Sequence, residues 1–178
     1  MNTLRAKILK TTIIGVLCFG VSPSLRAADG DSQQVLTLFS QAKSLALDLR
    51  EDTSEMEYFV ANRTSWETQF IFAERVTKDV LAARAKVDEL DKARIVASEW
   101  QRNAIDGINP LMRELVATTR VVVTSLDKKP FDKTEYYEYV KANRDHAEHL
   151  VALISAFVDY GHTRLRLEKE AEKIKKLN

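Results

Sequence analysis

Apolar residues recur at alternating spacings of three and four along most of this 178-residue sequence, and this heptad pattern constrains the fold more than any other feature. Such a repeat places its apolar residues on one stripe of an α-helix and predicts left-handed packing of several helices. Only five residues beyond position 27 are glycine or proline, so the chain has few places to turn. No alternation of period two is long enough for a strand. The sequence therefore predicts a few long helices.

The first predicted helix begins at Asp31 or Ser32, because either side chain can accept a hydrogen bond from a free amide of the first turn. Asp52 is the one polar residue in its seam. The apolar seam residues are Val35, Leu38, Ala42, Leu45, Leu49, Met56 and Phe59. Thr64 and Glu67 are spaced as a capping box that starts a second helix. The seam of the second helix is Ala73, Val76, Val80, Ala83, Val87 and Leu90.

The boundary between the second and third helices has two interpretations. In the one that we favour, the chain breaks at 93–97 and a third helix runs from Ser98 to about Leu126, with Ser98 and Gln101 as its capping box. Pro110 then lies inside this helix, on its outer face. The seam is Ile105, Ile108, Met112, Leu115, Thr119, Val122 and Leu126. The first three helices then have nearly equal lengths of about 30 residues, or roughly 45 Å.

In the second interpretation, helix two continues to Gly107. Asn109 and Pro110 would then start the third helix, as a cap followed by a proline at the first helical position.

The fourth helix has the strongest start signal in the sequence. Asp132 and Glu135 are spaced as a capping box, and Phe131 and Tyr136 occupy the two positions of a hydrophobic staple. The seam residues are Val140, Ala147, Leu150, Ile154, Phe157 and Gly161. Helical character continues to about Lys176, so this helix is longer than the other three by about 15 residues.

Four amphipathic helices with short connections pack as an up-down-up-down bundle. We therefore predict an all-α fold: a left-handed antiparallel four-helix bundle with an extended C-terminal helix. We expect residues 28–178 to form one domain, with Leu45, Val80, Leu115 and Ile154 buried in a shared core.

Residues 1–27 have the layout of a secretory signal peptide. A basic start precedes an apolar stretch at 11–22, which is shorter than the roughly 20 residues that a membrane-spanning helix needs. Cleavage after Ala27 removes the only cysteine, Cys18, and leaves a mature chain at 28–178 without disulfides. We expect a periplasmic or secreted protein whose mature form has no transmembrane anchor.

The predicted signal peptide holds four basic residues and no acidic one, so its removal changes the formal net charge from +1 to −3. A weakly acidic chain argues against nucleic-acid binding, which needs a basic face. Glu-x-x-His pairs for a di-iron centre and Cys-x-x-Cys-His for covalent haem are both absent from the sequence. We therefore expect a non-enzymatic protein without a cofactor.

The three histidines all fall on the fourth predicted helix. His146 and His149 could hold a metal from one helix face, because residues three apart are neighbours. If the seam faces inward, however, His149 points almost outward and His146 and His162 lie on opposite sides, so the pair would bind metal only weakly. Met112 and His146 fall at the same height along the bundle axis, as the two axial ligands of a haem would. Met112 is better explained as a core residue.

Aromatic residues gather at the head of the fourth helix: Phe131, Tyr136, Tyr137 and Tyr139. They could form the lip of a small-ligand pocket. We favour the interpretation that they fill the core and shield the loop. Trp66 and Trp100 are expected to cover bundle ends in the same way.

The last stretch of the chain, Arg164 to Lys176, holds six basic and three acidic residues. Its partial apolar stripe is Leu165, Leu167, Ala171 and Ile174. Either it is a solvated helix held by intrahelical ion pairs, or it is a docking arm for an acidic partner, a membrane surface or a second copy of the chain. The residues that we select for interaction are Arg164, Arg166, Lys169 and Lys173. Because the bundle ends near Gly161, we expect residues 162–178 to fray.

Two segments, WQRNAIDGINPL at 100–111 and ISAFVDYG at 154–161, resemble a family of small exported helical proteins of acidobacterial type. The resemblance implies export and an all-helical structure. It carries over no site residue, because the family has no assigned activity. We therefore expect a periplasmic bundle that acts through helix surfaces, as an adaptor or an envelope-stress binding protein. The alternative is a bundle that binds a small ligand, a metal or haem.

Overall fold

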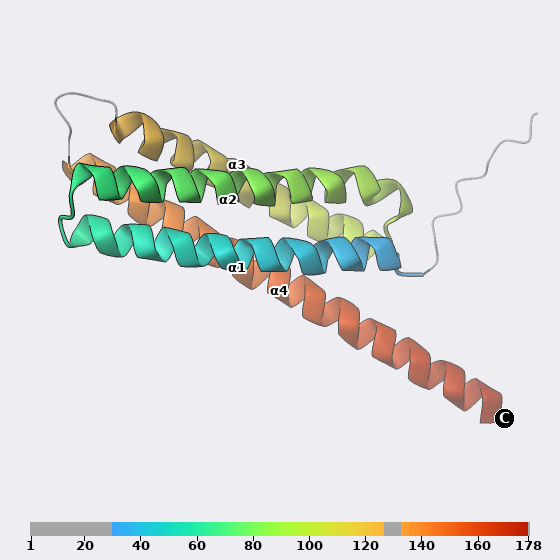
Figure 1. Ribbon diagram of the computed structural model, residues 1–178. Coiled ribbons are helices and arrows are strands. Elements are labelled where there is room, and N and C mark those ends of the chain that lie inside the picture. The colour runs from blue at the N-terminus through green and yellow to red at the C-terminus, as the bar shows by residue number, and fades with distance from the viewer. Residues whose placement is uncertain (1–29, 127–132, 178) are drawn as a thin grey trace, which may run out of the picture.

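The computed structural model describes residues 30–126 and 133–177, without the side chain of Lys133. The elements are α1 (Gln33–Ala61), α2 (Trp66–Lys92), the short 3₁₀ helix η1 (Ala93–Val96), α3 (Glu99–Leu126) and α4 (Lys133–Leu177). Successive long helices pack antiparallel and α4 also packs against α1, so the four close into a bundle (Figure 1). The all-α, up-down-up-down prediction is confirmed. The left-handed supercoil stays a prediction.

Some predicted features lie outside the described residues. These are the signal peptide at 1–27 and two residues of the start signal before α4, Phe131 and Asp132.

Of the two caps predicted for α1, Ser32 is the one that the structure has. Its Oγ accepts a hydrogen bond from the backbone N–H of Val35 at 3.4 Å. Asp31 has a different role, described below.

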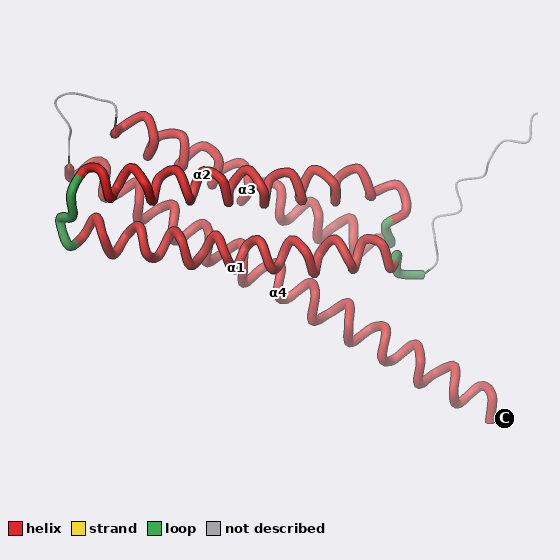
Figure 2. Tube along the Cα trace, in the orientation of Figure 1, coloured by secondary structure: helices red, strands yellow, loops and turns green. Residues whose placement is uncertain are grey.

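The capping box predicted for α2 is wrong by one residue. Ser65 is the cap, and its Oγ accepts from the N–H of Thr68 at 3.3 Å. The hydroxyl of Thr64 donates to the carbonyl of Phe59, in the last turn of α1. Thr64 therefore closes one helix and Ser65 opens the next. Figure 2 shows this loop and another short one between η1 and α3.

The break predicted at 93–97 is confirmed by η1, and the continuation of helix two to Gly107 is wrong. The backbone N–H of Ser98 donates to Oε1 of Gln101 at 3.0 Å, which is the reach-back half of the predicted capping box. Pro110 lies inside α3 with its side chain exposed, as predicted.

The seams predicted for α2 and α3 are buried at every position. The seam predicted for α1 is half wrong, because Leu38, Leu45 and Phe59 are only half-buried. The most buried alternation is Val35, Phe39, Ala42, Ala46, Leu49, Thr53 and Met56. The reason is that α1 packs against both α2 and α4, so it buries a face wider than one heptad seam. Val80, Leu115 and Ile154 share the core as predicted, whereas Leu45 lies at its margin.

The predicted α4 seam is buried except at Phe157, which is half-buried. One further seam position is polar: Asn143 is 1% exposed, and its Oδ1 lies 2.8 Å from Oγ1 of Thr118 and 3.0 Å from Oγ1 of Thr119. A polar contact inside an apolar seam favours one register between two helices. Here it fixes how α3 and α4 are paired.

Candidate interaction surface

The carboxylate of Asp31 joins three helices at the end of the bundle where α4 leaves it. Its side chain is 1% exposed. Oδ1 accepts from the hydroxyl of Ser98 at 2.9 Å and from the indole N–H of Trp100 at 2.5 Å, and Oδ2 accepts from Nε of Arg164 at 2.9 Å. We call these four residues the Asp31 cluster. Three donors satisfy the buried charge, so the cluster anchors the chain before α1 to both α3 and α4.

Gln101 reinforces the same junction. Its side chain accepts from the N–H of Ser32 and donates to the carbonyl of Ser32, each at 3.0 Å. The side chain of Gln101 thus ties the start of α1 to the start of α3. An apolar residue in its place would leave the N–H groups of Ser32 and Ser98 without their acceptor.

Gly161 brings α4 closest to its neighbours at this junction. A Cβ built on Gly161 would overlap the side chain of Leu36 and come within 3.2 Å of the ring of Trp100. One residue earlier in the chain, the ring of Tyr160 meets Trp100 edge-on at 4.9 Å between centroids. Close packing ends here, at the last point where α4 has neighbours on both sides.

Beyond Leu165 the side chains of α4 are exposed at every position from 166 to 177. We call residues 166–177 the arm. Figure 1 shows α4 continuing past the ends of the other helices to the C-terminus. Three large apolar side chains of the arm are solvent-exposed, Leu167 by 61%, Ile174 by 60% and Leu177 by 85%. The prediction that α4 outlasts the bundle is confirmed, and the helix itself continues to Leu177.

The apolar stripe of the arm differs from the predicted one at Leu165. At 100° per residue, Leu167, Ala171 and Ile174 lie within about 60° of one another, whereas Leu165 lies about 160° from Leu167. Leu165 is half-buried at the end of the bundle, and Tyr160 falls on the same stripe as Leu167. The exposed stripe therefore faces away from the seam that α4 uses in the bundle.

The four selected basic residues have different surroundings. Arg164 belongs to the Asp31 cluster and is not a free surface cation. Lys173 pairs with Glu170 at 3.0 Å within the arm. Arg166 and Lys169 are exposed. The structure thus assigns Arg164 to the base of the arm and the other three to its solvent-exposed part.

A groove between α2 and α3 also exposes apolar surface. It encloses about 460 Å³, and its lining residues are Phe70, Ala73, Glu74, Thr77, Lys78, Leu81, Val123 and Leu126. Leu81 is 62% exposed at its edge. We call it the α2–α3 groove. The sequence analysis did not predict this groove. The one indication in the sequence was Leu81, a large apolar residue that lies outside the predicted α2 seam.

A second pocket, of about 760 Å³, lies at the opposite end of the bundle from the Asp31 cluster. Its lining residues are Val60, Ala61, Arg63, Thr64, Trp66, Gln69, Thr134, Tyr136 and Tyr137. Tyr136 is the ring that enters the core, and burial raises the pKa of its phenol. Trp66 is half-exposed, so it covers this end only in part, whereas Trp100 covers the other end as predicted.

The histidines do not form a metal site with other residues that the structure describes. His149 and His162 are exposed, and His146 is half-buried with a buried Nδ1. Within residues 30–126 and 133–177, no group of three or more His, Cys, Asp or Glu side chains could hold a metal ion. The predicted pair His146 and His149 thus has no third ligand of these types among the described residues.

Asp52, the polar residue in the α1 seam, belongs to a charged cluster between α1 and α2. It pairs with Arg75, which also pairs with Glu55 at 3.1 Å. Burial, a hydrogen bond with Asp52 and the charge of Asp52 together raise the pKa of Asp79 to about 6. Three carboxyls near one arginine leave part of their negative charge uncompensated.

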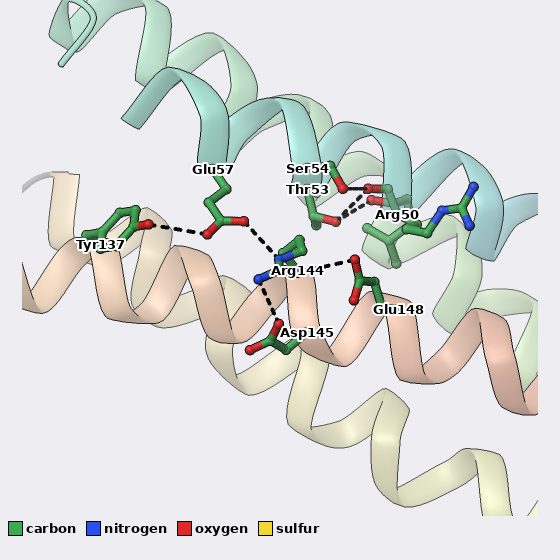
Figure 3. A network of polar contacts seen from close by, with 9 residues as sticks. Arg50, Thr53, Ser54, Glu57, Tyr137, Arg144, Asp145 and Glu148 are labelled. Atoms are coloured by element: carbon green, nitrogen blue, oxygen red, sulfur yellow. Dashed lines mark hydrogen bonds and ion pairs between the residues drawn. The ribbon is translucent and has the colours of Figure 1, made fainter. Parts of the chain in front are cut away.

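Arg144 makes the corresponding connection between α1 and α4. Its Nε lies 2.8 Å from Oε2 of Glu57, and the hydroxyl of Tyr137 donates to Oε1 of the same carboxylate at 3.4 Å. Figure 3 shows Arg144 between Glu57 on one side and Asp145 and Glu148 of its own helix on the other. The guanidinium thus forms ion pairs with three carboxylates, one on α1 and two on α4.

None of the described helices is long and apolar enough to cross a membrane. Comparison of the chain with protein-family models, with curated proteins and with solved structures gives no match. The resemblance to exported helical proteins of acidobacterial type stays a prediction.

Proposed function

We propose that the mature chain is a non-enzymatic exported adaptor that docks a protein partner through the arm. One observation carries the proposal: α4 continues for twelve residues beyond Leu165 as a helix with an exposed apolar stripe. An isolated helix of this length is marginal in water, because helix formation depends mostly on tertiary packing. A partner that covers Leu167, Ala171 and Ile174 would supply that packing.

The Asp31 cluster supports the same proposal. It holds α4 at Arg164, two residues before the arm begins, because the buried carboxylate of Asp31 bonds to Arg164 and also to residues at the start of α3. A helix fixed at its base presents its surface in one direction, which lowers the entropy lost when a partner binds. The signal-peptide layout of residues 1–27 supports export to the periplasm or the medium.

A photo-crosslinking side chain in place of Leu177 tests the proposal in the native envelope. We expect discrete adducts that disappear when Leu167→Glu and Ile174→Glu are added, because both changes put charge into the apolar stripe. The matched control has the crosslinker in place of Glu51, an exposed residue of α1. Equal adducts at both positions, or none at position 177, would contradict a docking role for the arm.

A small-ligand-binding bundle is the second candidate, and the 760 Å³ pocket favours it. Trp66, Tyr136 and Tyr137 offer aromatic surface there, and Gln69 and Arg63 offer polar groups, as ligand sites in proteins commonly do. Native mass spectrometry of protein purified from its own envelope would detect a retained ligand. The candidate requires that Trp66→Ala release that ligand while the bundle stays folded.

A further inference from the structure

The α2–α3 groove has the shape and chemistry to accept a helix. Apolar side chains from two neighbouring helices line it, and it is open to solvent along Leu81. An amphipathic helix binds in such a groove through residues spaced by three, four and seven positions. In the arm, Leu167, Ala171 and Ile174 have this spacing.

The two surfaces agree in length. The groove runs along α2 from Phe70 to Leu81, a rise of eleven positions or about 16 Å. The exposed apolar side chains of the arm extend from Leu167 to Leu177, a rise of ten positions or about 15 Å. One arm would therefore fill one groove.

The arm cannot reach the groove of its own chain. The groove lies between the first half of α2 and the end of α3, whereas the arm leaves the bundle at the other end, beside the start of α1 (Figures 1 and 2). Because α4 is one continuous helix from Lys133 to Leu177, the arm cannot fold back. Any arm that fills the groove comes from another molecule.

Charge favours a second copy as that molecule. The arm, 166–177, holds five basic and three acidic residues, and residues 28–165 hold 18 basic and 23 acidic residues. The formal charges are +2 and −5, so the arm of one copy is attracted to the body of another. The groove itself is lined by one acidic residue, Glu74, and one basic residue, Lys78, and the arm also carries charges of both signs.

We infer that the arm of one copy docks in the α2–α3 groove of a second copy, an inference that rests on the proposed docking function of the arm. The two surfaces are different patches at opposite ends of one molecule, so a single contact leaves one arm and one groove unoccupied. These two bind each other when a two-fold axis relates the copies, and otherwise they bind further copies in an open series. The contact is small, so association requires protein concentrations of about 10⁻⁴ M.

Two single substitutions separate this arrangement from other modes of association. In the full mature chain, Leu81→Glu puts a charge in the groove and Ile174→Glu puts a charge on the arm. Both side chains are more than half exposed, so neither change disturbs the core. Ile95→Glu is the matched control, because Ile95 is 75% exposed and belongs to neither surface.

Sedimentation equilibrium is the measurement. We expect the unsubstituted chain and Ile95→Glu to show a mass that rises continuously with concentration, and each of the other two variants to stay monomeric alone. An equimolar mixture of Leu81→Glu and Ile174→Glu should form one-to-one dimers and nothing larger, because one intact groove and one intact arm remain. Addition of salt should weaken the association.

The inference is wrong if the unsubstituted chain stays monomeric, if Ile174→Glu still associates, or if the mixture of variants does not recover dimers. The crosslinking test distinguishes these failures from a failure of the proposed function. Arm adducts with a different protein would leave the docking function standing and exclude self-association, whereas the absence of arm adducts together with a monomeric chain would remove both.

Discussion

Oδ2 of Asp31 lies 2.9 Å from Nε of Arg164, across 133 residues of sequence. This ion pair joins the residue before the cap of α1 to the point where α4 leaves the bundle. The same carboxylate accepts hydrogen bonds from Ser98 and Trp100 near the start of α3. One side chain therefore sets the mutual position of three helices and the direction of the arm.

Asp31→Ala should lower the free energy of unfolding by about 1–3 kcal/mol, because it leaves the half-buried donors of Ser98 and Trp100 without an acceptor. It should also speed amide exchange in the turn of α4 around Arg164. Chemical denaturation and hydrogen exchange measure the two effects. Asp31→Asn keeps the shape of the side chain and removes its charge. Its stability should lie between those of the unsubstituted protein and Asp31→Ala. Unchanged stability and exchange in Asp31→Ala would show that the cluster is not an anchor.

Leu115→Ala should cost about 2–5 kcal/mol of stability, because Leu115 is fully buried and the substitution leaves a cavity. Leu45→Ala should cost less, since Leu45 is half-buried at the edge of the core. His149→Ala, at an exposed position, should be nearly neutral. If the denaturation midpoints fall in the reverse order, these helices bury other faces than the structure indicates.

Two glycine substitutions of the same kind should have different effects. Alanine at either helical position gains up to about 1 kcal/mol in helix propensity. At Gly107 the new methyl group would meet its nearest neighbours at 3.8 Å, so Gly107→Ala should raise the melting temperature. At Gly161 it would overlap Leu36 and approach Trp100, so overpacking offsets the gain. The idea that Gly161 permits close helix approach fails if both variants are stabilised equally.

Asp79 should make the protein less stable as the pH rises from about 4 to about 6. Its pKa is raised from 3.8 to about 6, first by burial and then by Asp52, so the folded state holds the proton more tightly than the unfolded state. This carboxyl therefore opposes folding above the raised pKa and has no such effect below 3.8. Asp79→Asn should raise the free energy of unfolding near pH 7.5 by about 1 kcal/mol, after allowance for solvent screening, and change little near pH 4.

Exposed Glu51→Gln is the control for that change and should have a small effect at both pH values. Urea denaturation at each pH is the measurement. A gain for Asp79→Asn that is as large at pH 4 as at pH 7.5 would show that ionisation is not its cause.

Much of the bundle could be predicted because α2 and α3 each have one clear apolar stripe. Their seams, from Ala73 to Leu90 and from Ile105 to Leu126, are buried as the spacing indicates. The prediction was half wrong in α1, where apolar residues occupy adjacent stripes and spacing alone does not select between Leu45 and Ala46. Burial of Ala46 depends on which helices lie on either side, and this is a tertiary property.

The arm could be predicted from the lengths of the helices. A fourth helix of 45 residues extends beyond partner helices of 27 to 29 residues. The role of Asp31 could not be predicted, because its partners lie 67, 69 and 133 residues away and follow no local pattern. The α2–α3 groove depends on how two helices are rotated relative to each other. Leu81 and Val123 show no relationship in the sequence and meet only in the fold.

Hydrogen exchange along α4 of the full mature chain, at a concentration low enough to keep it monomeric, tests the central claim most directly. The arm lies outside the bundle and has few tertiary contacts, so its amides from 166 to 177 should exchange fast. The amides from Val140 to Ile154 should be protected, because that part of α4 is packed on α1 and α3. Slow exchange from 166 to 174 in the monomer would contradict the account, since it would mean that the arm packs on its own chain.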